Sequence, residues 1–238
     1  MAWISKNNYL SQSQMDNNAE IIWKNFKGSG GWSLYAVCAM LGNMVCESNI
    51  NPGIWEGLVV NPSERGFGLV QWTPATKLIQ WCNDRQLDYR EGDSQLLRIN
   101  AEVEANAQWF ENWYAPNLGY PRQPPWTFAA WTKLSNRPLG DMVADWALYY
   151  EHPSESRLKQ EIVKRTGYAE YYFTKWKDTE PEPPFIPDPP VEPPDPEPEP
   201  EPPVPDKPDP PEPHPPTVWR GGHLGIMYYG RSKKKYGI

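Results

Sequence analysis

The sequence predicts a mostly α-helical domain of the α+β class over residues 1–177, followed by a polyproline spacer over 178–217 and a short basic tail over 218–238. Three observations support this division. Apolar residues recur at helical spacing in most of the first part, a segment rich in glycine, proline and aromatic residues interrupts them at 52–74, and the composition changes abruptly after residue 177.

The spacer is defined by its composition. Residues 181–216 contain 20 of the 29 prolines, and acidic residues alternate with them. Such a segment cannot build a hydrophobic core, and it favours extended polyproline II stiffened by like-charge repulsion. We expect a spacer, and recognition of the proline tract by an adaptor domain stays open as an alternative.

Two helices are predicted near the N-terminus. Residues 16–27 carry Ile21, Ile22, Trp23 and Phe26 at helical spacing, and glycines at 28–31 end this helix. Ser33 can cap a second helix, whose apolar positions fall at i, i+3, i+4, i+7, i+10 and i+11 from Leu34. Asn51-Pro52-Gly53 then breaks the chain, which leaves Glu47 at the C-terminal end of the second helix, off its apolar stripe.

The remaining elements follow in order. Residues 52–74 predict a small hairpin or irregular β element, with Val59-Val60 and residues 67–72 as its strand-like runs. Helical patterns return at 75–85, 93–113, 139–151 and 155–176. The expected domain is therefore α-rich, with a small β element after the second helix.

Several kinds of site are not expected. The three cysteines are odd in number, and Cys38 and Cys46 lie eight residues apart on one predicted helix, about 12 Å and thus too far for a disulfide. The three histidines are scattered and form no metal-ligand pattern, so we expect no metal and no cofactor. Neither a signal peptide nor a membrane-spanning segment is visible, so a secreted activity would need release by lysis or packing in a virus particle.

The most informative residues form two motifs, ESNINP at 47–52 and GFGLVQWTP at 66–74. Together they resemble the phage tail lysozyme family, and more distantly the goose-type lysozymes and lytic transglycosylases. Gln95-Leu96-Leu97 before Glu102, and Tyr150-Glu151-His152-Pro153, extend the resemblance over about residues 30–155. It implies a lysozyme-like helical fold and cleavage of peptidoglycan at the β-1,4 bond between MurNAc and GlcNAc.

Glu47 is the predicted general acid. Cleaving a glycosidic bond requires a proton on the leaving oxygen, and a carboxylic acid supplies it near neutral pH when burial raises its pKa. Glu56 is the candidate for a second catalytic carboxylate that positions water, and Glu64 is the alternative. If neither acts, assistance by the substrate's N-acetyl group, or attack by its 6-hydroxyl as in lytic transglycosylases, remains open.

Further residues are predicted to contact the glycan. The resemblance places Gln71 on the cleft wall, and Gly68 would let the backbone approach the sugar closely. The other candidates for substrate binding are Ser48, Trp72, Thr73 and Tyr150, although Ser48 can equally cap its helix and Tyr150 can equally be core.

The expected role is that of a virion-associated muramidase, located in the phage tail, that opens the cell wall during genome entry. Two alternatives stay open: an inactive lysozyme-like structural or assembly protein of the tail, and an endolysin acting at host lysis. The tail at 218–238 combines five basic residues with Trp219 and three tyrosines. We expect it to bind a phage tail or knob protein, with no role in binding nucleic acid, and a solvated tail without a partner is the alternative.

Overall fold

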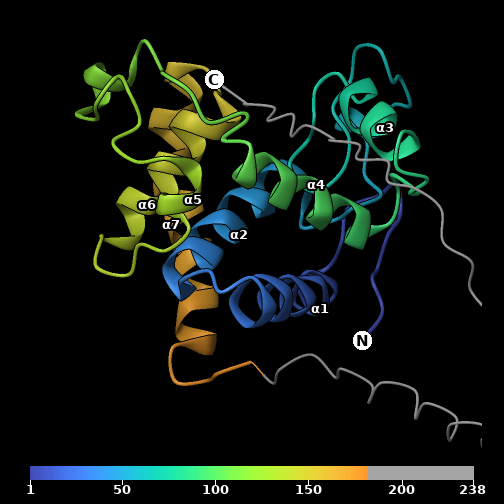
Figure 1. Ribbon diagram of the computed structural model, residues 1–238, viewed down its shortest axis with the longest axis horizontal. Helices are drawn as coiled ribbons and strands as arrows, with labels where there is room; N and C mark the ends of the chain where they lie inside the picture. The colour runs from blue at the N-terminus through green and yellow to red at the C-terminus, as the bar shows by residue number, and fades with distance from the viewer. Residues whose placement is uncertain (182–238) are drawn as a thin grey trace, which may run out of the picture. The chain divides into compact units, whose positions relative to one another are not determined.

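The described part of the chain, residues 1–181 of the computed structural model, contains seven α-helices and no strand (Figure 1). The α-helices are α1 (Gln12–Trp23), α2 (Leu34–Ser48), α3 (Thr76–Asn83), α4 (Gly92–Glu104), α5 (Phe128–Trp131), α6 (Leu139–Trp146) and α7 (Glu155–Trp176). π-Helical turns η1 (Lys24–Ser29) and η4 (Ala147–Glu151) extend α1 and α6, and the 3-10 turns are η2 (Glu56–Leu58) and η3 (Ala115–Leu118). The predicted mostly helical class is confirmed.

The segment predicted to hold a small β element is largely irregular. Within residues 52–74 the only β pairing consists of two isolated antiparallel bridges, Trp55 with Phe67 and Phe67 with Trp72. The tail at 218–238, and all but the first four residues of the spacer, lie outside the described residues. No helix among the described residues is both long and apolar enough to cross a membrane.

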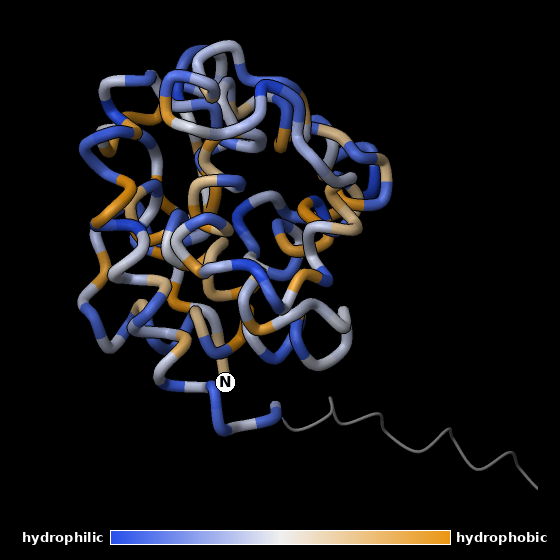
Figure 2. Tube along the Cα trace, turned by 90° about the vertical axis from the view of Figure 1, so that its left-hand side faces the viewer, coloured by the Kyte–Doolittle hydropathy of each residue, from blue (hydrophilic) through white to orange (hydrophobic). Residues whose placement is uncertain are grey.

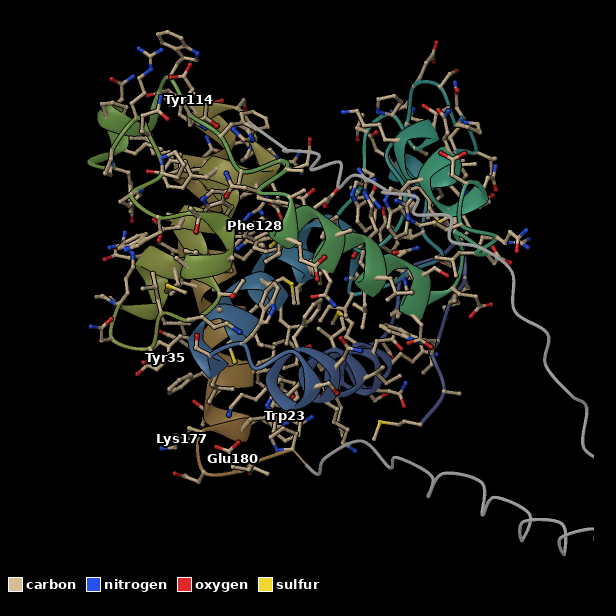
Figure 3. All side chains as sticks on the ribbon, in the orientation of Figure 1. Trp23, Tyr35, Tyr114, Phe128, Lys177 and Glu180 are labelled. Carbon is tan, nitrogen blue, oxygen red and sulfur yellow. The ribbon has the colours of Figure 1, made fainter. Side chains whose placement is uncertain are left out.

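α1 begins four residues earlier than its apolar spacing predicts, because Ser11 forms a capping box. Its hydroxyl accepts a hydrogen bond from the Gln14 amide, and the Gln14 side chain accepts one from the Ser11 amide at 3.1 Å. At its other end, Trp23 stacks on Trp176 of α7 with ring centroids 5.0 Å apart. Figure 3 shows Trp23 at the same end of the molecule as Lys177. α1 therefore packs against α7 through this pair of rings.

α2 is the central helix. Ser33 caps it as predicted, accepting a hydrogen bond from the Ala36 amide at 3.0 Å. Most of its residues are buried, and it packs mainly against α7 and α6. Gly42 allows this close approach, since a Cβ there would overlap the backbone carbonyl of Arg165 in α7.

The helix predicted over 93–113 ends at Glu104. Asn106 and Gln108 adopt left-handed backbone conformations, and the Asn106 side chain accepts a hydrogen bond from the Phe128 amide at 2.7 Å. That contact anchors the start of α5, a short helix that sequence spacing did not predict. Phe128 then packs in an aromatic cluster with Trp109, Trp131, Trp146 and Tyr150, in the interior of the domain (Figure 3).

These helices support two groups of elements. Figure 1 shows the loop-rich segment that carries α3 and the group of α5, α6 and α7 on either side of α4. Hydrophobic and hydrophilic stretches alternate along the trace (Figure 2), as amphipathic helices around a shared core require. The C-terminal end of α2, with Glu47, lies between the two groups.

Candidate active site

A pocket of about 670 Å³ lies at the C-terminal end of α2. One wall comes from residues 54–57 and 70–77, and the other from residues 108–110 and 150–157. Six of the eight predicted site residues line this pocket: Glu47, Glu56, Gln71, Trp72, Thr73 and Tyr150. Ser48 and Gly68 do not line it.

Glu47 occupies the last turn of α2, with 16% of its side chain exposed to the pocket. The helix ends directly after it because Asn49 and Ile50 adopt left-handed backbone conformations, with φ of 55° and 51°. The carboxyl group is therefore held at a fixed helix end and remains accessible to a ligand.

Ser48 is buried and serves the fold. Its hydroxyl donates a hydrogen bond to the Leu69 carbonyl at 2.7 Å, which joins the helix end to the second motif. Asn51, also buried, donates through its amide to the Lys6 and Asn8 carbonyls at 2.7 Å each. The polar residues of ESNINP after Glu47 thus fix the loop that follows the helix.

Gly68 is required for packing against Gln95. Its φ of +81° suits glycine, and a Cβ there would overlap the Gln95 side-chain amide. Gln95 is fully buried, accepts a hydrogen bond from the Leu69 amide at 2.8 Å and donates one to the Pro52 carbonyl at 2.8 Å. One side chain of α4 therefore links the two motifs.

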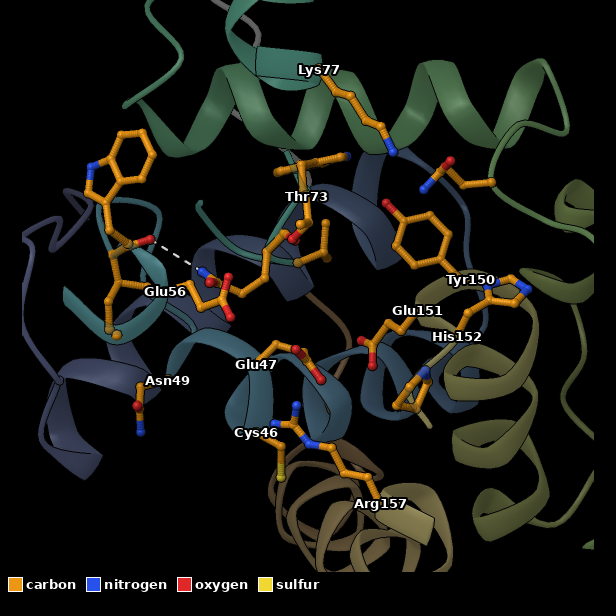
Figure 4. A pocket seen from close by; sticks show the side chains of 18 of the residues that line it. Cys46, Glu47, Asn49, Glu56, Thr73, Lys77, Tyr150, Glu151, His152 and Arg157 are labelled. Atoms are coloured by element: carbon orange, nitrogen blue, oxygen red, sulfur yellow. Dashed lines mark hydrogen bonds between the residues drawn. The ribbon is translucent and has the colours of Figure 1, made fainter. Parts of the chain in front are cut away.

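Gln71 and Thr73 lie on the pocket wall with part of their polar groups already engaged. The Gln71 amide nitrogen donates to the carbonyl of Ile54 at 3.2 Å (Figure 4) and to that of Gly68 at 2.9 Å, and the Thr73 hydroxyl donates to the Gln71 carbonyl at 2.9 Å. Thr73 is exposed, whereas Gln71 is half-buried. These contacts shape the wall that a ligand would meet.

Trp72 and Tyr150 are held against the pocket by Glu102. The Trp72 indole nitrogen donates to Glu102 at 3.1 Å, and the Tyr150 hydroxyl donates to the other carboxylate oxygen at 2.6 Å. Arg98 pairs with the same carboxylate at 2.7 Å. Burial, and then the charge of Glu102, raise the pKa of Tyr150 well above its usual value. Both aromatic residues therefore offer the pocket mainly their rings.

Glu56 lies on the wall opposite Glu151, with Glu47 between them (Figure 4). Its side chain is 50% exposed, accepts a hydrogen bond from the Gly66 amide at 3.0 Å and lies 3.6 Å from the Arg65 guanidinium. These contacts hold the carboxyl group at the pocket edge. Glu64, the alternative candidate, is exposed and does not line the pocket.

Sequence reasoning did not select two charged residues near Glu47: Arg165, which contacts it, and Glu151, which lines the pocket. Arg165 of α7 is fully buried and donates hydrogen bonds to Glu47 at 2.6 Å and to Glu151 at 2.5 Å. Burial disfavours the charge of Arg165, but these two carboxylates keep its pKa above the usual value. Burial raises the pKa of Glu151 to about 8, and the neighbouring charge of Glu47 acts in the same direction. The surroundings of Glu47 are therefore ionic.

The sequence held a signal for Arg165. Residues 158, 162, 165, 169, 172 and 176 form the inward-facing stripe of α7, and Arg165 is the only charged residue in it. A cation in an apolar stripe requires a buried anion. Glu151 lay in a segment already noted for its resemblance, but no local pattern distinguished it from Tyr150.

The pocket also has an apolar surface. Phe110 is half-exposed at its wall and stacks on His152 with ring centroids 4.1 Å apart. Burial lowers the pKa of His152, which therefore carries no charge near neutral pH. An aromatic face beside several polar groups suits a ligand with both apolar and hydroxyl-bearing surfaces, such as a sugar. No cluster of three metal-ligating side chains occurs within residues 1–181.

The chain is similar to a known family and to a known phage protein. The sequence profile described as phage tail lysozyme matches residues 17–176. Morphogenesis protein 1 of Bacillus phage B103 is 40% identical over 169 residues, which cover 71% of this chain and 42% of that protein. The chain therefore spans less than half the length of this relative.

Proposed function

This chain belongs to the phage tail lysozyme family, and from that premise we propose that it is a muramidase that cleaves peptidoglycan at the β-1,4 bond between MurNAc and GlcNAc. The observation that carries the proposal is Glu47, fixed at the end of α2 and accessible from a pocket with acidic, hydroxyl-bearing and aromatic walls. Glycosidases place an acid where it can protonate the leaving oxygen of the scissile bond.

In this mechanism Glu47 is the general acid. Its proton moves to the glycosidic oxygen while positive charge develops on the sugar ring on the other side of the breaking bond. We propose Glu56 as the carboxylate that positions the attacking water, since its side chain is half-exposed and lines the same pocket. Gln71, Thr73 and the face of Phe110 would contact the glycan.

The test is digestion of purified peptidoglycan by the full chain, with the soluble products identified by mass spectrometry. Reducing-end muramic acid products would support a muramidase, whereas anhydro ends would assign lytic transglycosylase chemistry instead. Glu47→Gln should lose at least about a hundredfold in rate, because an amide cannot donate the proton. Glu104→Gln, at an exposed glutamate of α4, is the matched control. Absence of products with the wild-type chain on several wall types would refute the proposed activity.

A second candidate function is structural. The name of the phage B103 relative, Morphogenesis protein 1, favours a role in assembling the particle. The exposure of the Glu47 carboxyl group to the pocket supports catalysis instead, and the digestion experiment distinguishes the catalytic role from the structural one. We further propose a location in the virion tail, action on the wall during genome entry, and attachment to a tail or knob protein through the basic tail at 218–238.

A further inference from the structure

The carboxyl groups around Arg165 outnumber the cations that neutralise them. Arg165 donates to Glu47 at 2.6 Å, to Glu151 at 2.5 Å and to Glu161 at 3.0 Å. It also donates to the buried amide oxygen of Asn43 at 2.8 Å. The guanidinium is therefore shared by three carboxyl groups, two of which line the pocket.

Glu161 has a second cation. Arg157 donates to it at 3.1 Å, and although burial opposes ionisation, the hydrogen bonds from Arg165 and Arg157 lower the pKa of Glu161. Glu161 is thus ionised at neutral pH. Two arginines and one carboxylate leave a single positive charge to balance Glu47 and Glu151 together.

The other titratable groups facing this cluster do not change that balance. Burial raises the pKa values of Cys46 on α2 and Tyr150 on η4 and lowers that of His152, so all three are neutral near pH 7. Lys164 of α7 is exposed to solvent, where water screens its charge. The remaining polar contact of Glu151 is neutral, a hydrogen bond from the Trp146 indole at 2.8 Å.

A buried group of this kind is most stable when it is electrically balanced, because an uncompensated charge in the interior is costly. Balance is reached when Glu47 and Glu151 hold one proton between them. Figure 4 shows the carboxyl ends of these two residues pointing toward one another at the pocket floor. They belong to α2 and η4, and Arg165 of α7 connects these two elements through its hydrogen bonds to both carboxyl groups.

We propose that Glu151 is a positioning residue that shares a single proton with Glu47 across the neutral pH range. The exchange is balanced: Glu151 gives up its proton and becomes a carboxylate, and Glu47 takes up a proton and becomes the acid. Between the two proton losses of the pair, a constant fraction of molecules carries the proton on Glu47. The inference rests on the proposed function in one respect, namely that Glu47 donates this proton to the substrate.

The pH profile of peptidoglycan cleavage tests this sharing. The wild-type chain should keep a level rate through neutral pH and decline only above about pH 8, where the pair loses its last proton. In Glu151→Gln, Glu47 is the only acid left in the pair. The rate should therefore begin to fall, by about tenfold per pH unit, at a lower pH than in the wild-type chain. Glu104→Gln should keep the wild-type profile. A Glu151→Gln chain that folds and keeps the wild-type alkaline limb would overturn the proposal.

A second measurement covers the case in which Glu151→Gln does not fold. NMR of the full chain labelled with ¹³C at the glutamate carboxyl carbons should show two carboxyls, those of Glu47 and Glu151, that both change near pH 8 in the wild type, because they lose the same proton. In Glu47→Gln this titration should move to lower pH, because the like charge is gone. If no carboxyl titrates above pH 6 in the wild type, the sharing is refuted. A wild-type chain without activity would refute the proposed function, while the NMR titration would still decide whether the two carboxyls share a proton.

Discussion

Replacing Arg165 by methionine removes the guanidinium that Glu47, Glu151 and Glu161 share, and leaves an apolar side chain of similar length. Arg165 is 0% exposed, and Glu151 is nearly so. Removing one partner of a buried ion pair leaves an uncompensated charge and costs about 3–5 kcal/mol of unfolding free energy. For a domain of this size that corresponds to a fall in Tm of about 6–20 °C.

The loss should depend on pH. In Arg165→Met the folded state takes up protons on its unpaired carboxyls as the pH falls, so the free energy gap to the wild type should be larger at pH 7 than at pH 4.5. Urea denaturation at both pH values measures it. The control is Lys24→Met, which breaks the exposed i,i+4 pair with Glu20 and should cost less than about 1 kcal/mol.

Two results would refute this reasoning. A loss at pH 7 no larger than that of Lys24→Met would mean that the buried charges do not depend on Arg165. Equal losses at pH 4.5 and pH 7 would mean that Arg165 acts through packing of its side chain and not through its charge.

Two further variants test the supports of the site. Gly42→Ala should lower the free energy of unfolding by about 1–3 kcal/mol in urea denaturation, because its Cβ would push against the α7 backbone. The control is Gly140→Ala in α6, where a Cβ has ordinary space, and equal stabilities of the two variants would contradict the close α2–α7 packing. Ser48→Ala should lower the free energy of unfolding by about 1–3 kcal/mol, because the buried Leu69 carbonyl loses its hydrogen-bond donor. The control Ser63→Ala, at an exposed serine, should change the free energy of unfolding by less than about 0.5 kcal/mol. A similarly small value for Ser48→Ala would show that this hydrogen bond does not hold the loop.

Local patterns predicted several elements well. The spacing from Leu34 and the cap at Ser33 predicted α2 with its observed start, and the left-handed residues after Ser48 lie where the ESNINP motif indicated a break. The prediction of a helix over 93–113 was wrong beyond Glu104. There a side-chain contact between Asn106 and α5 competes with helix continuation.

For the site, the sequence motifs predicted Glu47 and most of the pocket wall. They did not predict Arg165 and Glu151, the charged partners of Glu47. Ser48 and Gly68 were predicted to contact substrate, and the structure places both in packing contacts away from the pocket. Their substrate role stays an untested prediction. Only the fold revealed that the Ser48 hydroxyl donates its hydrogen bond to a carbonyl 21 residues away.

The sequence by itself determined the helical class, the capping and ends of α2, and the position of an acid at the end of that helix, because helix periodicity and capping depend on residues within about four positions of one another. Tertiary structure decided the charge environment of that acid. Arg165 reaches Glu47 from 118 residues away, and Glu151 joins them from a third element. The balance of charge in a buried cluster is a property of distances through space, to which separation along the chain gives no guide.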